Sequence, residues 1–217
     1  MKLIPTVFAK NKKDFDLKFR EIVKTNKEIQ IDFMDGIFVK SKSIELKDLP
    51  NLKKYKNKFE AHLMVKDPGN WIYDLKEKGF YKVLFHYESV KDLDEINRLV
   101  FLAKSEKMEA WIVFNPETDF NKVFEVFNKI HSGISGIMFM GHTSGIEGKP
   151  LDINVVRRVR NFKRIYKKIR IQIDGGINDK NIKDLNIVGV DIINVGSFVS
   201  KARDPKKALE LLKKRFN

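Results

Sequence analysis

Short apolar runs alternate with longer amphipathic stretches along the whole chain. The runs have the length of β-strands, and the charged stretches that follow them carry apolar residues at helical spacing. Gly79 is the expected stop of the third helical segment. We predict strands at 3–8, 29–34, 59–65, 81–87, 109–116, 136–141, 169–176 and 190–197, and helical segments at 12–25, 46–56, 68–79, 92–107, 119–130, 152–168, 178–185 and 204–216.

Eight strand–helix units in 217 residues indicate a parallel sheet. Their number favours a closed (β/α)8 TIM barrel made by one domain, residues 1–217, with its active site at the carboxyl ends of the strands. An open doubly wound sheet is the alternative. No GxGxxG motif follows the first strand to support the dinucleotide-binding form of that fold.

Three of the predicted strands carry polar residues on one face. Residues two apart on a strand share a face, and the apolar face of a barrel strand meets the helices, so the other face points into the barrel. The three inward sets are Gln30 with Asp32 and Met34, Glu60 with His62 and Met64, and Arg170 with Gln172 and Asp174.

Asp32, His62 and Asp174 should therefore converge at the barrel mouth. Such a group can bind a divalent metal, or its carboxylates can exchange protons with a substrate carbon. Alone, His62 would be a hydrogen-bonded core histidine. Burying two carboxylates together costs several kcal/mol unless a positive group compensates them, which favours a functional site.

Glycines end the last strands. Gly175 and Gly176 lie in "DGGIN", Gly196 precedes Ser197 in "VGS", and Gly145 and Gly148 lie in "GIEG". Loops after the last barrel strands commonly bind phosphate through backbone N–H groups. The order of these turns predicts a phosphorylated substrate.

The net charge of +14 comes from 43 Lys and Arg against 29 Asp and Glu. The basic residues are scattered and lack interleaved aromatics, which favours a solvated surface over a nucleic-acid partner. Cysteine is absent, and neither a signal peptide nor a membrane span is recognisable. We expect a cytoplasmic protein without a membrane partner.

The motifs "IQIDFMDG", "AHLMV", "FH" at 85–86, "FNPET", "QIDGGIN" and "VGSFV" together resemble the ribulose-phosphate 3-epimerase family, from the first strand to the last helix. The resemblance implies an isomerase of the pentose phosphate pathway that interconverts D-ribulose 5-phosphate and D-xylulose 5-phosphate. Asp32 and Asp174 would act as acid and base on opposite faces of the sugar. A divalent ion (Zn, Fe, Mn or Mg) would be held by Asp32, His62 and Asp174, and the protein would form a homo-oligomer. The substrate-binding positions implied are Thr6, Met34, His62, Met64, His86, Met140, Gly145, Gly148, Gly175, Gly176, Gly196 and Ser197.

Two departures from the family pattern affect the expected chemistry. Gln30 stands where the family has a histidine ligand, so its amide oxygen would be a weaker fourth ligand and would favour ions harder than zinc. The segment "MGHTSGIEGKPL" replaces the usual loop after the sixth strand. Epimerisation of a six-carbon ketose phosphate such as allulose 6-phosphate therefore stays open, as does a non-catalytic sugar-phosphate-binding barrel. The related decarboxylases and aldolases carry an Asp-x-Lys-x-x-Asp run, and "DFMD" has no such lysine.

Overall fold

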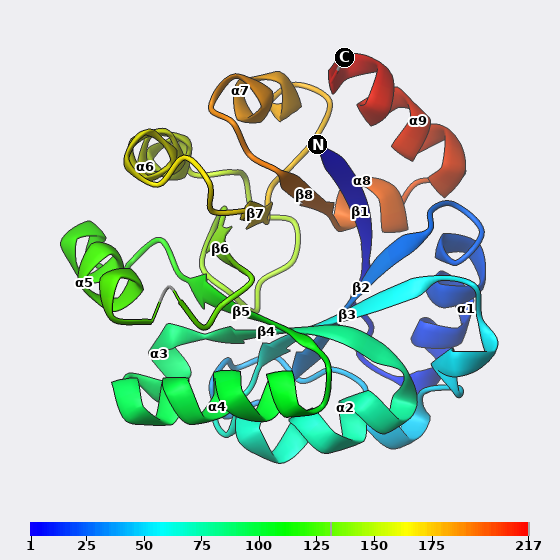
Figure 1. Ribbon diagram of the computed structural model, residues 1–217. Coiled ribbons are helices and arrows are strands. Elements are labelled where there is room, and N and C mark those ends of the chain that lie inside the picture. Colours follow the sequence, from blue (N-terminus) through cyan, green and yellow to red (C-terminus); the bar gives the residue numbers. More distant parts are fainter. Residues whose placement is uncertain (131, 217) are drawn as a thin grey trace.

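The computed structural model describes residues 1–130 and 132–216, and its core is a closed barrel of parallel strands. Each strand pairs with the next, and β1 also pairs with β8, which closes the sheet (Figure 1). The predicted barrel is confirmed and the open sheet is excluded. The strands are β1 (Lys2–Val7), β2 (Glu28–Met34), β3 (Lys58–Met64), β4 (Phe80–His86), β5 (Glu109–Phe114), β6 (Gly136–Met140), β7 (Ile171–Asp174) and β8 (Ile192–Val195).

Helices surround the strands as an outer ring (Figure 1). They are α1 (Lys12–Ile22), α2 (Ile72–Lys78), α3 (Tyr87–Val90), α4 (Leu93–Ser105), α5 (Phe120–Ile130), α6 (Ile153–Ile165), α7 (Ile182–Ile187), α8 (Ser197–Ser200) and α9 (Pro205–Phe216), with 3-10 turns η1 (Leu46–Asp48), η2 (Leu52–Lys54) and η3 (Pro68–Trp71). Gly79 ends α2 with a φ of 106°, as predicted.

The helix expected at 46–56 is instead the two short turns η1 and η2. Pro50 lies between them, and the residue before a proline is pushed out of the helical region. Leu49 accordingly has an extended backbone, with φ −74° and ψ 143°. The short helix α8, directly after β8, was not predicted.

The strand faces divide the interior into two layers. Ile31, Phe33 and Leu63 lie between the strands and the helices, in the main apolar core. A second apolar cluster lies inside the barrel and includes Leu84 and Trp111. The inward polar faces predicted for β2 and β3 are confirmed. On β7 the prediction is confirmed for the residues from Gln172 to the end of the strand. Arg170 lies before β7, where its half-exposed guanidinium pairs with Glu109 at 2.9 Å.

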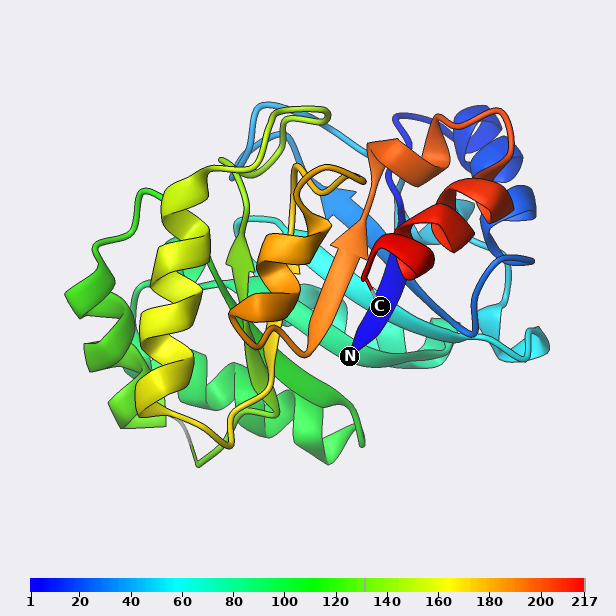
Figure 2. The same cartoon turned by 90° about the horizontal axis from the view of Figure 1, so that it is seen from above.

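The loops after the strands gather at one end of the barrel, which lies at the top of Figure 2. There the loop after β2 (35–45) crosses to the loop after β6 (141–152). The Ser41 hydroxyl donates to the Gly145 carbonyl at 2.6 Å. Asp35 secures the first loop by accepting the backbone N–H groups of Ile37 and Lys66 at 2.8 and 2.7 Å. Across the described residues, no helix is long and apolar enough to span a membrane.

Candidate active site

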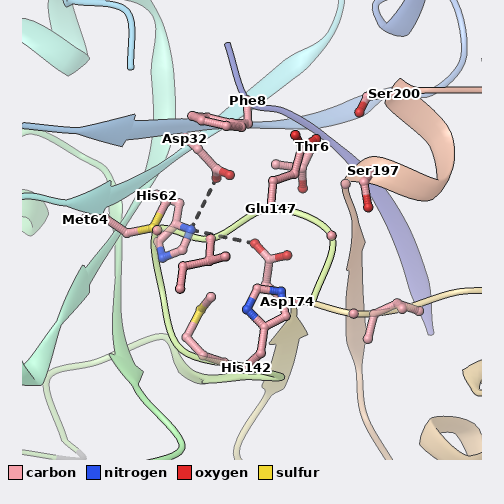
Figure 3. Close-up of a pocket in the computed structure, with 18 of the residues that line it drawn as sticks. Thr6, Phe8, Asp32, His62, Met64, His142, Glu147, Asp174, Ser197 and Ser200 are labelled. Carbon is pink, nitrogen blue, oxygen red and sulfur yellow. Dashed lines mark hydrogen bonds and ion pairs between the residues drawn. The ribbon is translucent and has the colours of Figure 1, made fainter. Parts of the chain in front are cut away.

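A pocket opens at the carboxyl ends of the strands, and nearly all the predicted site residues line it (Figure 3). Gln30 and His86 do not line it: Gln30 lies beneath the two aspartates, and His86, at the end of β4, lies behind His62. The predicted residues at the pocket wall are Thr6, Asp32, Met34, His62, Met64, Met140, Gly145, Gly148, Asp174, Gly175, Gly176, Gly196 and Ser197. Phe8, His142, Ile146, Glu147, Ile177 and Ser200 complete the wall.

The strand register brings two aspartates and a histidine together at the floor of this pocket. Asp32 on β2 pairs with His62 on β3, and Asp174 ends β7. His62 Nδ1 lies 3.3 Å from Asp32 Oδ1 and 3.7 Å from Asp174 Oδ2 (Figure 3). The three ligand atoms lie within 4.8 Å of one another. The convergence predicted from strand parity is therefore present.

His86 and Glu88 support His62 from behind. His62 Nε2 lies 2.9 Å from His86 Nε2, and His86 Nδ1 lies 3.3 Å from Glu88 Oε2. Burial lowers the pKa of His86. Burial alone would raise the pKa of Glu88, but hydrogen bonds from His86, Thr118 and the Asn115 N–H bring it below its ordinary value.

An ionised Glu88 decides which ring nitrogens carry protons. With the His86 proton held on Nδ1 by Glu88, His86 Nε2 accepts from His62 Nε2, and in this tautomer the His62 Nδ1 lone pair faces Asp32 and Asp174. One imidazole lone pair and two carboxylate oxygens then face a single point. This donor set suits a divalent cation.

The carboxyl group of Asp174 has a strongly perturbed pKa. Burial, reinforced by the neighbouring Asp32 charge, raises its pKa from 3.8 to about 7. A carboxyl group with a pKa near neutrality can both donate and accept a proton at working pH.

This pKa predicts how the stability of the metal-free protein depends on pH. Between pH 3.8 and about 7 the folded state keeps a proton on Asp174 that the unfolded state has released, so the unfolding free energy falls as pH rises. The Asp174→Asn variant lacks this group. Its unfolding free energy relative to wild type should rise by a few kcal/mol from pH 4 to pH 8, since each pKa unit corresponds to about 1.4 kcal/mol. Urea titrations at several pH values measure the difference, and parallel profiles for the two proteins would contradict the assignment.

Gln30 lies directly beneath the two aspartates. Its Nε2 donates to Asp32 Oδ1 at 2.9 Å and to Asp174 Oδ2 at 2.5 Å, while its Oε1 accepts from Asn194 Nδ2 at 2.8 Å. The amide thus presents N–H groups where the sequence interpretation expected a ligand oxygen. The orientation differs from the one that metal ligation by Gln30 would need.

The glycines at the rim serve different structural needs. Gly175 and Gly176 have φ values of 112° and 73°, and a Cβ on Gly176 would lie 2.2 Å from the Leu151 nitrogen. A Cβ on Gly145 would contact Val39 at 2.7 Å. Gly196, in contrast, has a negative φ and nothing within 4 Å of an added Cβ. Gly148 also has nothing within 4 Å of an added Cβ, but its φ is 84°, so among these five glycines Gly196 alone combines open side-chain space with a negative φ.

Two buried polar residues of the strands, Lys82 on β4 and Asn194 on β8, were not predicted from the sequence. Each is a single polar residue in an apolar run, and each shares its strand face with the barrel interior. The parity argument applied to β2, β3 and β7 would have found both.

Comparison with known proteins identifies the family of this chain. The model of the ribulose-phosphate 3 epimerase family matches residues 2–200. The chain belongs to this family. It is an isomerase of the epimerase class, as the motifs indicated. The chain is 24% identical to ribulose-phosphate 3-epimerase of Eremothecium gossypii over 97% of this chain and 91% of that one. Identity to the Mycobacterium leprae ribulose-phosphate 3-epimerase is 28%, over 86% of this chain and 83% of the other.

Solved structures share the epimerase's fold at lower identity. A 3-hexulose-6-phosphate synthase from Salmonella typhimurium aligns over 100% of this chain and 98% of its own, with a TM-score of 0.76 and 17% identity. KGPDC from Streptococcus mutans, in complex with D-R5P, aligns over 99% and 96%, with a TM-score of 0.74 and 12% identity. At these identities the likeness concerns the barrel alone.

Proposed function

We propose that this epimerase inverts C3 of a phosphorylated ketose, most simply interconverting D-ribulose 5-phosphate and D-xylulose 5-phosphate. The observation that carries the proposal is the pair of buried aspartates, Asp32 from β2 and Asp174 from β7, at the floor of one pocket. Inversion needs a base on one face of the carbon and an acid on the other. Binding a sugar phosphate without catalysis does not need two such groups.

Proton transfer follows from the positions of these two residues. One ionised aspartate removes the proton from C3, and the electron pair moves toward the C2 carbonyl oxygen to give an enediolate. The other aspartate, protonated, delivers its proton to C3 from the opposite face. The raised pKa of Asp174 allows the protonated form to be populated near neutral pH. In the reverse reaction the two aspartates exchange roles.

Asp32, His62 and Asp174 are the residues that would hold a divalent cation. When bound, such an ion supplies positive charge that stabilises the enediolate oxygens. The apolar walls formed by Met34, Met64 and Met140 limit access of water to the reacting carbon. The mixed oxygen and nitrogen donor set is compatible with Mn²⁺, Fe²⁺ or Mg²⁺ as well as zinc.

The phosphate would lie at the other side of the pocket, against the turns at Gly175, Gly176, Gly196 and Ser197. The positive φ of the first two glycines turns the backbone back at the end of β7. Thr6 and Ser200 add hydroxyl groups to the pocket wall.

Hydrogen exchange at C3 tests the proposal directly. In D₂O, the wild-type protein should convert D-ribulose 5-phosphate into D-xylulose 5-phosphate that carries deuterium at C3, as read by ¹H NMR. Chelator should slow the exchange, and added Mn²⁺ should restore it. An Asp32→Asn, Asp174→Asn double variant is the matched control and should show none. Exchange seen only with a six-carbon ketose phosphate would show that such a sugar is the substrate. Exchange with neither sugar would refute epimerisation.

A further inference from the structure

A connected group of polar side chains lies inside the barrel below the aspartates. It includes one residue from each of five strands, all fully or almost fully buried: Gln30, Glu60, Lys82, Gln172 and Asn194. None of them lines the pocket. Burying so many polar groups is costly unless their hydrogen bonds are satisfied, so the directions of those bonds are informative.

The network starts at a group that can only donate. The Lys82 ammonium donates to Glu60 Oε2 at 2.8 Å and to Gln172 Oε1, and it lies 3.8 Å from the centre of the Trp111 ring. Because an ammonium has no acceptor, Gln172 must present its oxygen to Lys82. Its Nε2 then donates to Glu60 Oε1 at 2.7 Å and to Asn194 Oδ1 at 2.5 Å.

The donor-to-acceptor direction of these hydrogen bonds continues through Asn194 to Gln30. Asn194 Nδ2 donates to Glu60 Oε1 at 2.9 Å and to Gln30 Oε1 at 2.8 Å. A carboxylate paired with an ammonium, as Glu60 is with Lys82 at 2.8 Å, only accepts hydrogen bonds, which independently requires a nitrogen from both Gln172 and Asn194. With its oxygen engaged by Asn194, Gln30 has only its N–H₂ group left for the aspartates. If the Gln30 amide were flipped, its oxygen would face two carboxylates and its nitrogen would face Asn194 Nδ2, so neither contact would be a hydrogen bond.

We propose that Lys82, Glu60, Gln172 and Asn194 position Gln30 as a hydrogen-bond donor shared by Asp32 and Asp174, so that Gln30 gives no oxygen ligand to a cation bound at the site. Gln30 instead holds one oxygen of each carboxylate at a set place below the pocket. The cation site then has three protein ligands. This inference rests on the proposed function only for its effect on turnover, and its main test uses no substrate.

Mn²⁺ affinity of the metal-stripped protein distinguishes a donor from a ligand. Mn²⁺ binding is measured by titration with detection of free Mn²⁺ by electron paramagnetic resonance. Gln30 donates to Asp32 Oδ1 and Asp174 Oδ2, the same oxygens that face His62 Nδ1, so as a donor it competes with a cation for them. Gln30→Met should then bind Mn²⁺ as tightly as wild type or more tightly. If its oxygen is a ligand, the same change should weaken binding by roughly tenfold or more, and that result would overturn the proposal. Met138→Leu, another buried change inside the barrel, controls for loosening of the interior.

A change at Asn194 gives an effect that a merely structural role would not produce. Asn194→Leu removes the closer of the two donors to Gln30 Oε1, because Asn194 Nδ2 lies at 2.8 Å and Gln172 Nε2 at 3.4 Å. The amide then becomes freer to turn its oxygen toward the cation. Mn²⁺ should then bind roughly three- to tenfold more tightly, although the side-chain amide of Asn194 bonds to Gln30, Glu60 and Gln172 and not to the aspartates. The gain should vanish when Asn194→Leu is combined with Gln30→Met.

Two results would refute the proposed positioning of Gln30. One is an equal effect of Asn194→Leu on Mn²⁺ affinity in the wild-type protein and in Gln30→Met. The other is weaker Mn²⁺ binding by the Asn194→Leu single variant. In the exchange assay, Gln30→Met should lower kcat by roughly tenfold and leave KM within about twofold, because it positions the acid and base and does not contact substrate. If the wild-type protein shows no exchange at C3 but the Gln30 and Asn194 variants show the expected Mn²⁺ affinities, the proposed function is refuted and this inference stands.

Discussion

The Asp174→Asn variant is expected to lose epimerisation by roughly 10²- to 10⁴-fold, the usual contribution of a positioned acid or base. Asparagine keeps the size of the side chain but neither takes nor gives a proton. Interconversion of ribulose 5-phosphate and xylulose 5-phosphate is followed by a coupled assay or by NMR. We expect kcat to account for most of the loss, because the variant retains the turns that are proposed to bind phosphate.

Exchange at C3 separates the loss of one base from general damage. With Asp32 still present, one of the two epimers should keep some solvent exchange at C3 although it is no longer converted. Asp184→Asn, an exposed change on α7, is the matched control and should behave as wild type. Near-normal turnover of Asp174→Asn would remove Asp174 from the mechanism.

The Gly196→Leu variant should lose most of its kcat/KM for the phosphorylated sugar, chiefly through a higher KM. Nothing lies within 4 Å of a Cβ at this position, so a side chain can start there without a clash, and the rest of the leucine would extend into the pocket near Ser197. We expect a loss of roughly 100-fold, as a good set of charge-assisted hydrogen bonds to phosphate is worth a few kcal/mol.

Free ribulose provides the control for this prediction. It should be a very poor substrate of the wild-type protein, and Gly196→Leu should change its kcat/KM little, because no phosphate is displaced. If Gly196→Leu lost activity on the phosphorylated and the free sugar equally, its side chain would be obstructing the reacting carbon and not the phosphate. Equal wild-type activity on the phosphorylated and free sugars would refute the phosphate assignment.

Much of the architecture could be predicted from local sequence patterns. Eight apolar runs at regular spacing require a parallel sheet, and the two-residue period of β2, β3 and β7 places Asp32, His62 and Asp174 on inward faces. These properties depend on alternation along single strands. They can therefore be read without knowing how distant strands pair.

The tertiary structure decided what those inward residues do to one another. The pKa of Asp174 depends on its burial and on the nearness of Asp32, which lies 142 positions earlier in the chain. The amide of Gln30 could have offered either its oxygen or its nitrogen. Its direction is set by Lys82, Gln172 and Asn194, which only closure of the barrel brings beside it. Residue types along the strands determined which groups enter the site, and contacts between distant strands determined their protonation and orientation, because both depend on neighbours that the local sequence does not contain.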